Sequence, residues 1–253
     1  MSCTAVTILA TALALGCPVL PAAALKPQTA PSLAGAPGGE HLAGGQVAGV
    51  GREGRIAASH GGNWASNRRL KTREAEVSAK WEYVRSRMRT EEETIAACRM
   101  DLESCSQAAR SFLDIVELGR QREGRARLGE INRAVNLRIK PVDDWVQHGV
   151  DDFWSTPLAT LAAGAGDCED YAILKYAALR ELGVAPDDLR IIIVRDLRRG
   201  ADHAVLAVRD DEQWLILDNR TLVLAKTADI RHYLYLVVLD RRGAKSFEEV
   251  AFR

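Results

Sequence analysis

The stretch GDCEDYAILKY, residues 166–176, holds the local signals that decide the fold. Asp167 is a favourable N-cap residue, and Asp170 stands three positions later as a carboxylate version of the capping box. Apolar residues continue at helical spacing beyond this stretch until Gly183 ends the pattern. We therefore predict an amphipathic helix with Cys168 in its first turn.

The position of Cys168 has opposing effects on its thiol. Free N–H groups and the positive end of the dipole at a helix N-terminus favour the thiolate. The neighbouring carboxylates of Asp167, Glu169 and Asp170 instead favour the neutral thiol. Cys168 is therefore either an inert core residue or a nucleophile assisted by a base and by a group that offsets these acids.

Strand signals follow the cysteine helix. Residues 189–196 are β-branched and nearly all apolar, which predicts a central strand. Residues 202–210 and 213–218 predict a hairpin, and residues 232–240 predict a last strand. Before the cysteine helix, helical spacing predicts helices over residues 77–88, 94–98, 106–121 and 129–139, then an irregular loop over residues 142–157. Helices followed by an antiparallel sheet indicate the α+β class.

The hairpin carries a candidate base and its partner. His203 shares a strand face with Val205 and Ala207, and Asp218 ends the adjacent strand. A carboxylate that accepts a hydrogen bond from one imidazole nitrogen leaves the other nitrogen free to take a thiol proton. Cys168, His203 and Asp218 in this order therefore indicate a thiol hydrolase. The alternatives are a surface histidine and a turn aspartate, and His148 and His232 are rival bases.

The N-terminal part of the chain predicts export. Residues 1–24 are apolar and end in small residues, as in a secretory signal peptide, although no Lys or Arg precedes the apolar run. A lipoprotein anchor at Cys17, an uncleaved anchor and a misassigned start codon are the alternatives. Residues 25–72 are rich in Gly, Ala, Pro and Ser and predict a disordered linker, so we expect the folded domain over residues 73–253.

Charge and cysteine content bear on nucleic-acid binding and on disulfide formation. The 253 residues have a formal net charge of +0, which predicts no nucleic-acid partner, and we interpret the basic run at residues 120–140 as a solvated helix face. Cys98 and Cys105 flank a plausible helix break and are a candidate disulfide in an oxidising compartment. Two free thiols are the alternative, and one continuous helix over both would forbid the bond.

The segments GDCEDYAILKY, DHAVLAV and WLILDNR, with INRAVN and the Cys98–Cys105 pair, resemble the bacterial transglutaminase-like cysteine peptidases. The resemblance covers roughly residues 77–239. It implies a papain-like fold with Cys168 as nucleophile, His203 as base and Asp218 as the residue that orients the base. It also implies a calcium-dependent periplasmic protease that releases large adhesins near an alanine pair, controls biofilm attachment, and is sequestered by a membrane receptor for a cyclic dinucleotide.

The calcium dependence implied by this resemblance suggests a role for the acids. Asp167, Glu169 and Asp170 offer the oxygen ligands that Ca²⁺ prefers, and a bound cation would reverse their effect on the thiol. Helix capping is the alternative role for these acids. Trp154 is a candidate oxyanion donor through its indole N–H, or it packs against the cysteine helix. An acyltransferase and a non-catalytic binding module are the alternative functions.

Overall fold

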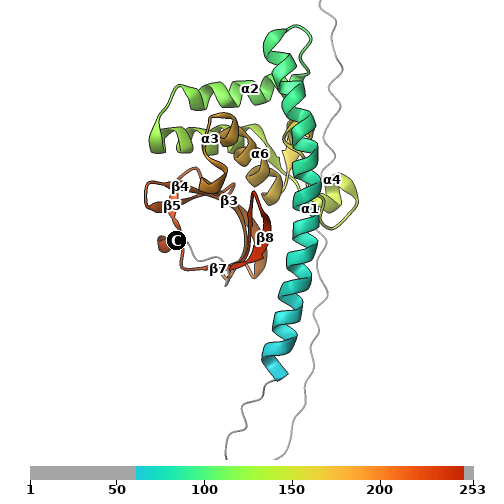
Figure 1. The fold of residues 1–253 in the computed structure, drawn as a ribbon, viewed down its shortest axis with the longest axis vertical. Helices are drawn as coiled ribbons and strands as arrows, with labels where there is room; N and C mark the ends of the chain where they lie inside the picture. The colour runs from blue at the N-terminus through green and yellow to red at the C-terminus, as the bar shows by residue number, and fades with distance from the viewer. Residues whose placement is uncertain (1–60, 248–253) are drawn as a thin grey trace, which may run out of the picture. The chain divides into compact units, whose positions relative to one another are not determined.

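The computed structural model describes residues 61–247, with side chains from residue 71 onward. The first element is α1, Gly61–Met100, a 40-residue helix along one side of the molecule (Figure 1). It occupies residues 61–72, where we expected linker. The reason is visible in the sequence, since no glycine or proline interrupts residues 63–100. The signal peptide and residues 25–60 of the linker lie outside the described residues.

Five further helices precede the main sheet. They are α2 (Gln107–Arg120), α3 (Gly124–Arg138), α4 (Asp144–His148), α5 (Pro157–Ala163) and α6 (Cys168–Glu181). The break between α1 and α2 and the helix at α6 agree with the prediction. The prediction of an irregular loop over residues 142–157 was wrong in part, because this segment contains α4 and leads directly into α5.

The two helices that were not predicted, α4 and α5, differ in how their N-termini are stabilised. Helix α4 is short but locally encoded, since Asp143 caps its start and Gly149 ends it in the left-handed conformation. Helix α5 has Pro157 at its first position, yet its N-terminal donors are satisfied from α1. Glu91 accepts hydrogen bonds from the Thr156 hydroxyl and the Leu158 N–H. A cap that comes from 65 residues away is invisible to local sequence patterns.

The main sheet has six antiparallel strands in the order β6-β5-β4-β3-β7-β8. Strand β3 lies between β4 and β7, which confirms the predicted central strand. The short edge strands β6 and β8 were not predicted. Two-residue strands β1 and β2 form a separate parallel pair. The bounds are β1 Lys140–Pro141, β2 Ala165–Gly166, β3 Leu189–Asp196, β4 Ala201–Asp210, β5 Gln213–Leu217, β6 Ala225–Lys226, β7 Tyr233–Asp240 and β8 Gly243–Ser246.

Side chains alternate between two apolar clusters on the two faces of this sheet. The larger cluster joins one face to the helices and includes Leu206, Val208 and Ile173. The smaller cluster lies on the other face and includes Val205, Ala207 and Tyr233. The strands of this sheet curve strongly (Figure 1). The mixed helical and antiparallel architecture confirms the α+β class.

Within residues 61–247, no helix is long and apolar enough to cross a membrane.

Candidate active site

Helix α6 begins at Cys168, as predicted, but its acids do not cap it. Asp167 occupies the N-cap position without making a side-chain cap hydrogen bond. Asp170 Oδ1 instead accepts the Ser155 N–H at 2.8 Å, which ties the segment before α5 to the cysteine helix. The Asp170 carboxylate also packs against Gly166, where an added Cβ would lie 2.5 Å from Oδ2. The capping role predicted for the two aspartates is therefore wrong.

His203 and Asp218 meet where β4 pairs with β5. His203 Nε2 lies 2.9 Å from Asp218 Oδ1, and both side chains are buried. The pairing of Leu206 with Leu217 sets this register. His203 Nδ1 is buried and has no hydrogen-bond partner within the described part of the chain. Asp218 therefore accepts from Nε2, and Nδ1 is the nitrogen left to receive a proton.

Three donors fix the Asp218 carboxylate. Besides His203, the Arg220 N–H reaches Oδ1 at 2.9 Å and the Tyr233 hydroxyl donates to Oδ2 at 2.6 Å. Burial alone would raise the pKa of Asp218, but the hydrogen bonds and charge of His203, with the Tyr233 hydroxyl, hold it well below its ordinary value. The carboxylate is thus ionised and aimed at the imidazole. Sequence patterns did not point to Tyr233.

Cys168 and His203 line the same cavity, which has a volume of about 520 Å³. The Cys168 thiol donates a hydrogen bond to Glu169 Oε2 at 3.3 Å. Burial and the charges of Glu169 and Asp167 raise the pKa of Cys168 well above its usual value, opposed by the Ala204 N–H of strand β4. Without a cation beside these acids, the thiol is therefore neutral.

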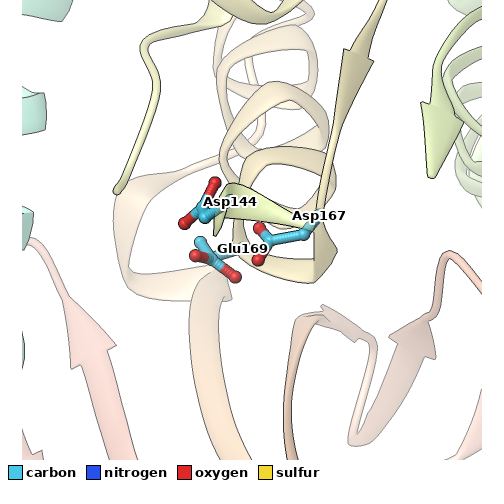
Figure 2. Close-up of side chains that lie close together, drawn as sticks. All are labelled: Asp144, Asp167 and Glu169. Atoms are coloured by element: carbon cyan, nitrogen blue, oxygen red, sulfur yellow. The ribbon is translucent and has the colours of Figure 1, made fainter. Parts of the chain in front are cut away.

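Three acidic side chains gather at the start of α6 (Figure 2). Asp144, Asp167 and Glu169 each offer an oxygen within 4.8 Å of the others. Burial and neighbouring carboxylates raise the pKa of Asp167 to about 6 and that of Glu169 well above its usual value. Asp144 Oδ1 and Asp167 Oδ1 are buried and have no hydrogen-bond partner among residues 61–247. Unpartnered carboxylate oxygens in such a cluster fit a hard divalent cation such as Ca²⁺.

This cluster differs from the predicted ligand set. Asp144, on α4, replaces Asp170, which uses Oδ1 on the Ser155 backbone and lies outside the group. Asp144 is 1% exposed, and its other carboxylate oxygen accepts the Phe153 N–H. The pair of aspartates at residues 143–144 was the sequence signal that could have indicated a metal ligand in α4. However, no sequence pattern linked α4 to the start of α6, because the β1–β2 pairing that joins these segments is only two residues long.

Trp154 lines the cavity but does not offer its donor there. The indole N–H donates to Asp152 Oδ1 at 2.8 Å, and the buried ring belongs to the larger apolar cluster. This geometry argues against Trp154 as the oxyanion donor and favours the packing alternative. Of the rival bases, His148 stacks against Phe153 and His232 lies against Tyr233. Neither rival lines the cavity that holds Cys168.

Cys98 and Cys105 form a disulfide between the end of α1 and the turn before α2, with Cα atoms 4.9 Å apart. The helix break at Met100 makes this approach feasible, since a continuous helix would separate the two Cα atoms by about 10 Å. Cys168 is the one free cysteine among the residues that the structure describes.

Residues 92–249 match the family model of the bacterial transglutaminase-like cysteine proteinases, which covers more than half of the chain. The chain belongs to this family. It is therefore a cysteine proteinase by descent, and the segments that hold Cys168, His203 and Asp218 all lie within the match. No curated protein matches the chain in sequence.

The fold is also similar to solved structures of LapG from Legionella pneumophila. One is 22% identical with a TM-score of 0.51, covering 61% of this chain and 86% of that chain. A calcium-bound structure of LapG is 23% identical with a TM-score of 0.53, covering 62% of this chain and 87% of that chain. An EGTA-treated structure of LapG is equally similar in fold, with a TM-score of 0.51. At this level of identity, the likeness establishes the shared fold of the proteinase domain.

Proposed function

We propose that the protein is an exported, calcium-dependent cysteine endopeptidase that cleaves a surface or periplasmic protein such as a large adhesin. The observation that carries the proposal is the state of His203. Its Nε2 is held by Asp218, and its Nδ1, beside the cavity that Cys168 lines, has no partner among the described residues. An imidazole with this tautomer fixed has one remaining role, which is to exchange protons with the thiol or the substrate.

The reaction follows from these positions. His203 Nδ1 takes the thiol proton, and Cys168 Sγ attacks the carbonyl carbon of a peptide bond. His203 returns the proton to the leaving amine as the C–N bond breaks and a thioester forms. Water then loses a proton to His203, attacks the thioester and regenerates the thiol, and the new C-terminus leaves as a carboxylate. Asp218 keeps its charge and stabilises the imidazolium at each stage.

The acidic cluster supplies the calcium dependence in this proposal. Asp144, Asp167 and Glu169 would hold the ion, which would contribute positive charge next to the thiol. With its carboxylate engaged there, Glu169 no longer has to accept the Cys168 hydrogen bond. Asp167 would likewise stop opposing ionisation of the thiol. This cluster and the calcium-bound structure of LapG support the metal proposal.

The substrate and the compartment rest on the resemblance of the sequence to adhesin-releasing peptidases and on residues 1–24 as a signal peptide. A receptor that senses a cyclic dinucleotide is the expected membrane partner. The cavity wall contains charged side chains of both signs, including Arg73, Glu76 and Asp202, as expected for a polar polypeptide substrate. Acyl transfer to an amine would use the same triad.

The decisive experiment incubates the purified protein with fragments of candidate surface proteins, in Ca²⁺ or in chelator. Wild type should cleave a fragment in Ca²⁺, and Cys168→Ala should leave it intact. Failure of wild type on every fragment would remove the endopeptidase proposal, and cleavage in chelator would remove the calcium proposal alone. Adding a primary amine separates the alternatives, because an acyltransferase would yield an amide-linked product in place of a free carboxyl terminus.

A further inference from the structure

A second cavity lies beside the one that contains Cys168. Its volume is about 270 Å³, and it lies between the middle of α1 and the segment that leads to α5. The lining residues are Ala79, Lys80, Tyr83, Asp152, Phe153 and Trp154. We call it the aromatic groove, because Tyr83 and Phe153 line it together with the indole of Trp154.

The aromatic groove adjoins the cavity of the candidate active site. Lys80, Asp152 and Trp154 line both cavities. Lys80 Nζ lies 2.5 Å from Asp152 Oδ2 and donates to the Asp152 carbonyl at 2.9 Å. This ion pair connects α1 to the loop that precedes α5. A polypeptide in the active-site cavity can therefore extend over the ion pair and reach the groove.

The charged groups of the groove and the Trp154 indole N–H are already paired with one another. Lys80 neutralises Asp152, and the Trp154 indole uses its N–H on Asp152 Oδ1. What the groove offers to a ligand is therefore mainly aromatic surface. Tyr83 is 51% exposed and Phe153 is 41% exposed, and both line this one groove. An apolar side chain would bury both rings without displacing a charge.

We propose that the aromatic groove is a substrate subsite that takes a large apolar side chain of the cleaved polypeptide, a few residues from the scissile bond. This inference rests on the proposed endopeptidase function. The α1 wall of the groove, formed by Ala79, Lys80 and Tyr83, lies before residue 92, where the match to the family begins.

The test uses a library of peptides produced by digesting a bacterial proteome. The purified full chain cleaves this library in Ca²⁺, and the new termini are sequenced by mass spectrometry. Wild type should enrich Leu, Met, Phe or Tyr at one fixed position relative to the cut. Tyr83→Ala should lose that enrichment and raise KM for a selected peptide about tenfold, with kcat unchanged. Tyr83→Phe should keep both properties of wild type, because the ring makes the contact.

Two controls separate the subsite from other effects of substitution. Met100→Ala removes an exposed apolar side chain from the same helix, about 25 Å further along its axis, and should change nothing. Alkylation of Cys168 by iodoacetamide should proceed at the wild-type rate in Tyr83→Ala, since the groove contributes nothing to thiol reactivity.

The possible outcomes distinguish the inference from the proposed function. Absence of cleavage by wild type would contradict both the endopeptidase function and the subsite. Cleavage without an enriched apolar position, or with enrichment that persists in Tyr83→Ala, would overturn the subsite alone. Sedimentation that shows a wild-type dimer and a Tyr83→Ala monomer, with unchanged peptide preference, would also overturn it and would assign the groove to a second copy of the chain.

Discussion

The Tyr233 hydroxyl lies 2.6 Å from Asp218 Oδ2, while His203 contacts Oδ1 of the same carboxylate. Tyr233 begins β7, which is separated from β5 by β4 and β3 in the sheet order. The hydrogen bond therefore links the start of β7 to the end of β5 across the two strands that separate them. Asp218 cannot rotate away from the imidazole without breaking a buried hydrogen bond on each side.

Tyr233→Phe should weaken this arrangement while preserving the ring. Loss of the hydroxyl leaves Asp218 Oδ2 buried without this donor, which should lower the free energy of unfolding by about 1–3 kcal/mol. The freed carboxylate should also hold His203 less firmly, so we expect kcat to fall about tenfold or more with little change in KM. Urea unfolding and steady-state kinetics on one cleaved peptide measure the two effects.

The matched control is Tyr235→Phe. Tyr235 belongs to the same strand, and its hydroxyl donates to the Thr227 carbonyl rather than to Asp218. The Tyr235→Phe variant should therefore keep the wild-type kcat. Equal losses of kcat in both variants would show that Tyr233 acts through strand packing and not through Asp218.

Asp218→Asn should have a larger effect on catalysis. The amide preserves the shape of the side chain but removes the charge that stabilises the imidazolium and the strong acceptor that selects the Nε2–H tautomer. We expect kcat to fall by ~10³- to 10⁴-fold, as for other orienting carboxylates in triads. The ¹⁵N shifts of His203 should report a changed tautomer. Wild-type shifts together with full activity would remove Asp218 from the site.

Asp144→Asn and Asp170→Asn test the revised metal ligands. If Asp144 belongs to the site, Ca²⁺ at 100 times its Kd should stabilise wild type and Asp170→Asn by about 2.7 kcal/mol, and Asp144→Asn by far less. In chelator, Asp144→Asn should melt at a higher temperature than wild type, because it removes one of three clustered acids. Thermal unfolding with and without Ca²⁺ measures this. Loss of the response only in Asp170→Asn would restore the ligand set predicted from sequence.

Lys175 predicts a pH dependence of stability. The side chain is fully buried on α6, and its Nζ has no hydrogen-bond partner in the part of the chain that the structure describes. Burial lowers the pKa of Lys175 to about 7. Between pH 7 and the unfolded value of 10.5, the unfolded chain binds more protons than the folded chain. Wild-type stability should therefore gain on the order of 2 kcal/mol between pH 7 and 9.

Lys175→Met removes this titration but keeps most of the side-chain volume. The difference in unfolding free energy between wild type and Lys175→Met should therefore change with pH, in favour of wild type as the pH rises. Other titrating groups largely cancel in this difference. Parallel pH profiles for the two proteins would mean that Lys175 keeps its ordinary pKa through a partner such as Asp218.

Sequence patterns predicted the parts of the fold that are encoded locally. The uninterrupted β-branched run at β3, the hairpin of β4 and β5, and the start of α6 at Cys168 all carry signals within a few residues. Alternation also predicted correctly that His203 shares a strand face with Val205. These elements need only periodicity and a turn to be recognised.

The parts that were missed depend on distant partners. Helix α5 is capped by Glu91 from α1, and Asp170 accepts a hydrogen bond from the Ser155 N–H. Neither contact could be deduced from neighbouring residues in the sequence. Asp144 joins the acids of α6 only through tertiary folding. The indole N–H of Trp154 is likewise bonded to Asp152, a contact that sequence patterns did not predict.

The acids around Cys168 have a consequence for the maturation of the protein. The chain must oxidise Cys98 and Cys105 to a disulfide while it leaves Cys168 reduced. Disulfide exchange and peroxide oxidation both require the thiolate. A thiol held neutral by its burial and by Glu169 and Asp167 reacts slowly in both, so Cys168 can stay reduced while the disulfide between Cys98 and Cys105 forms.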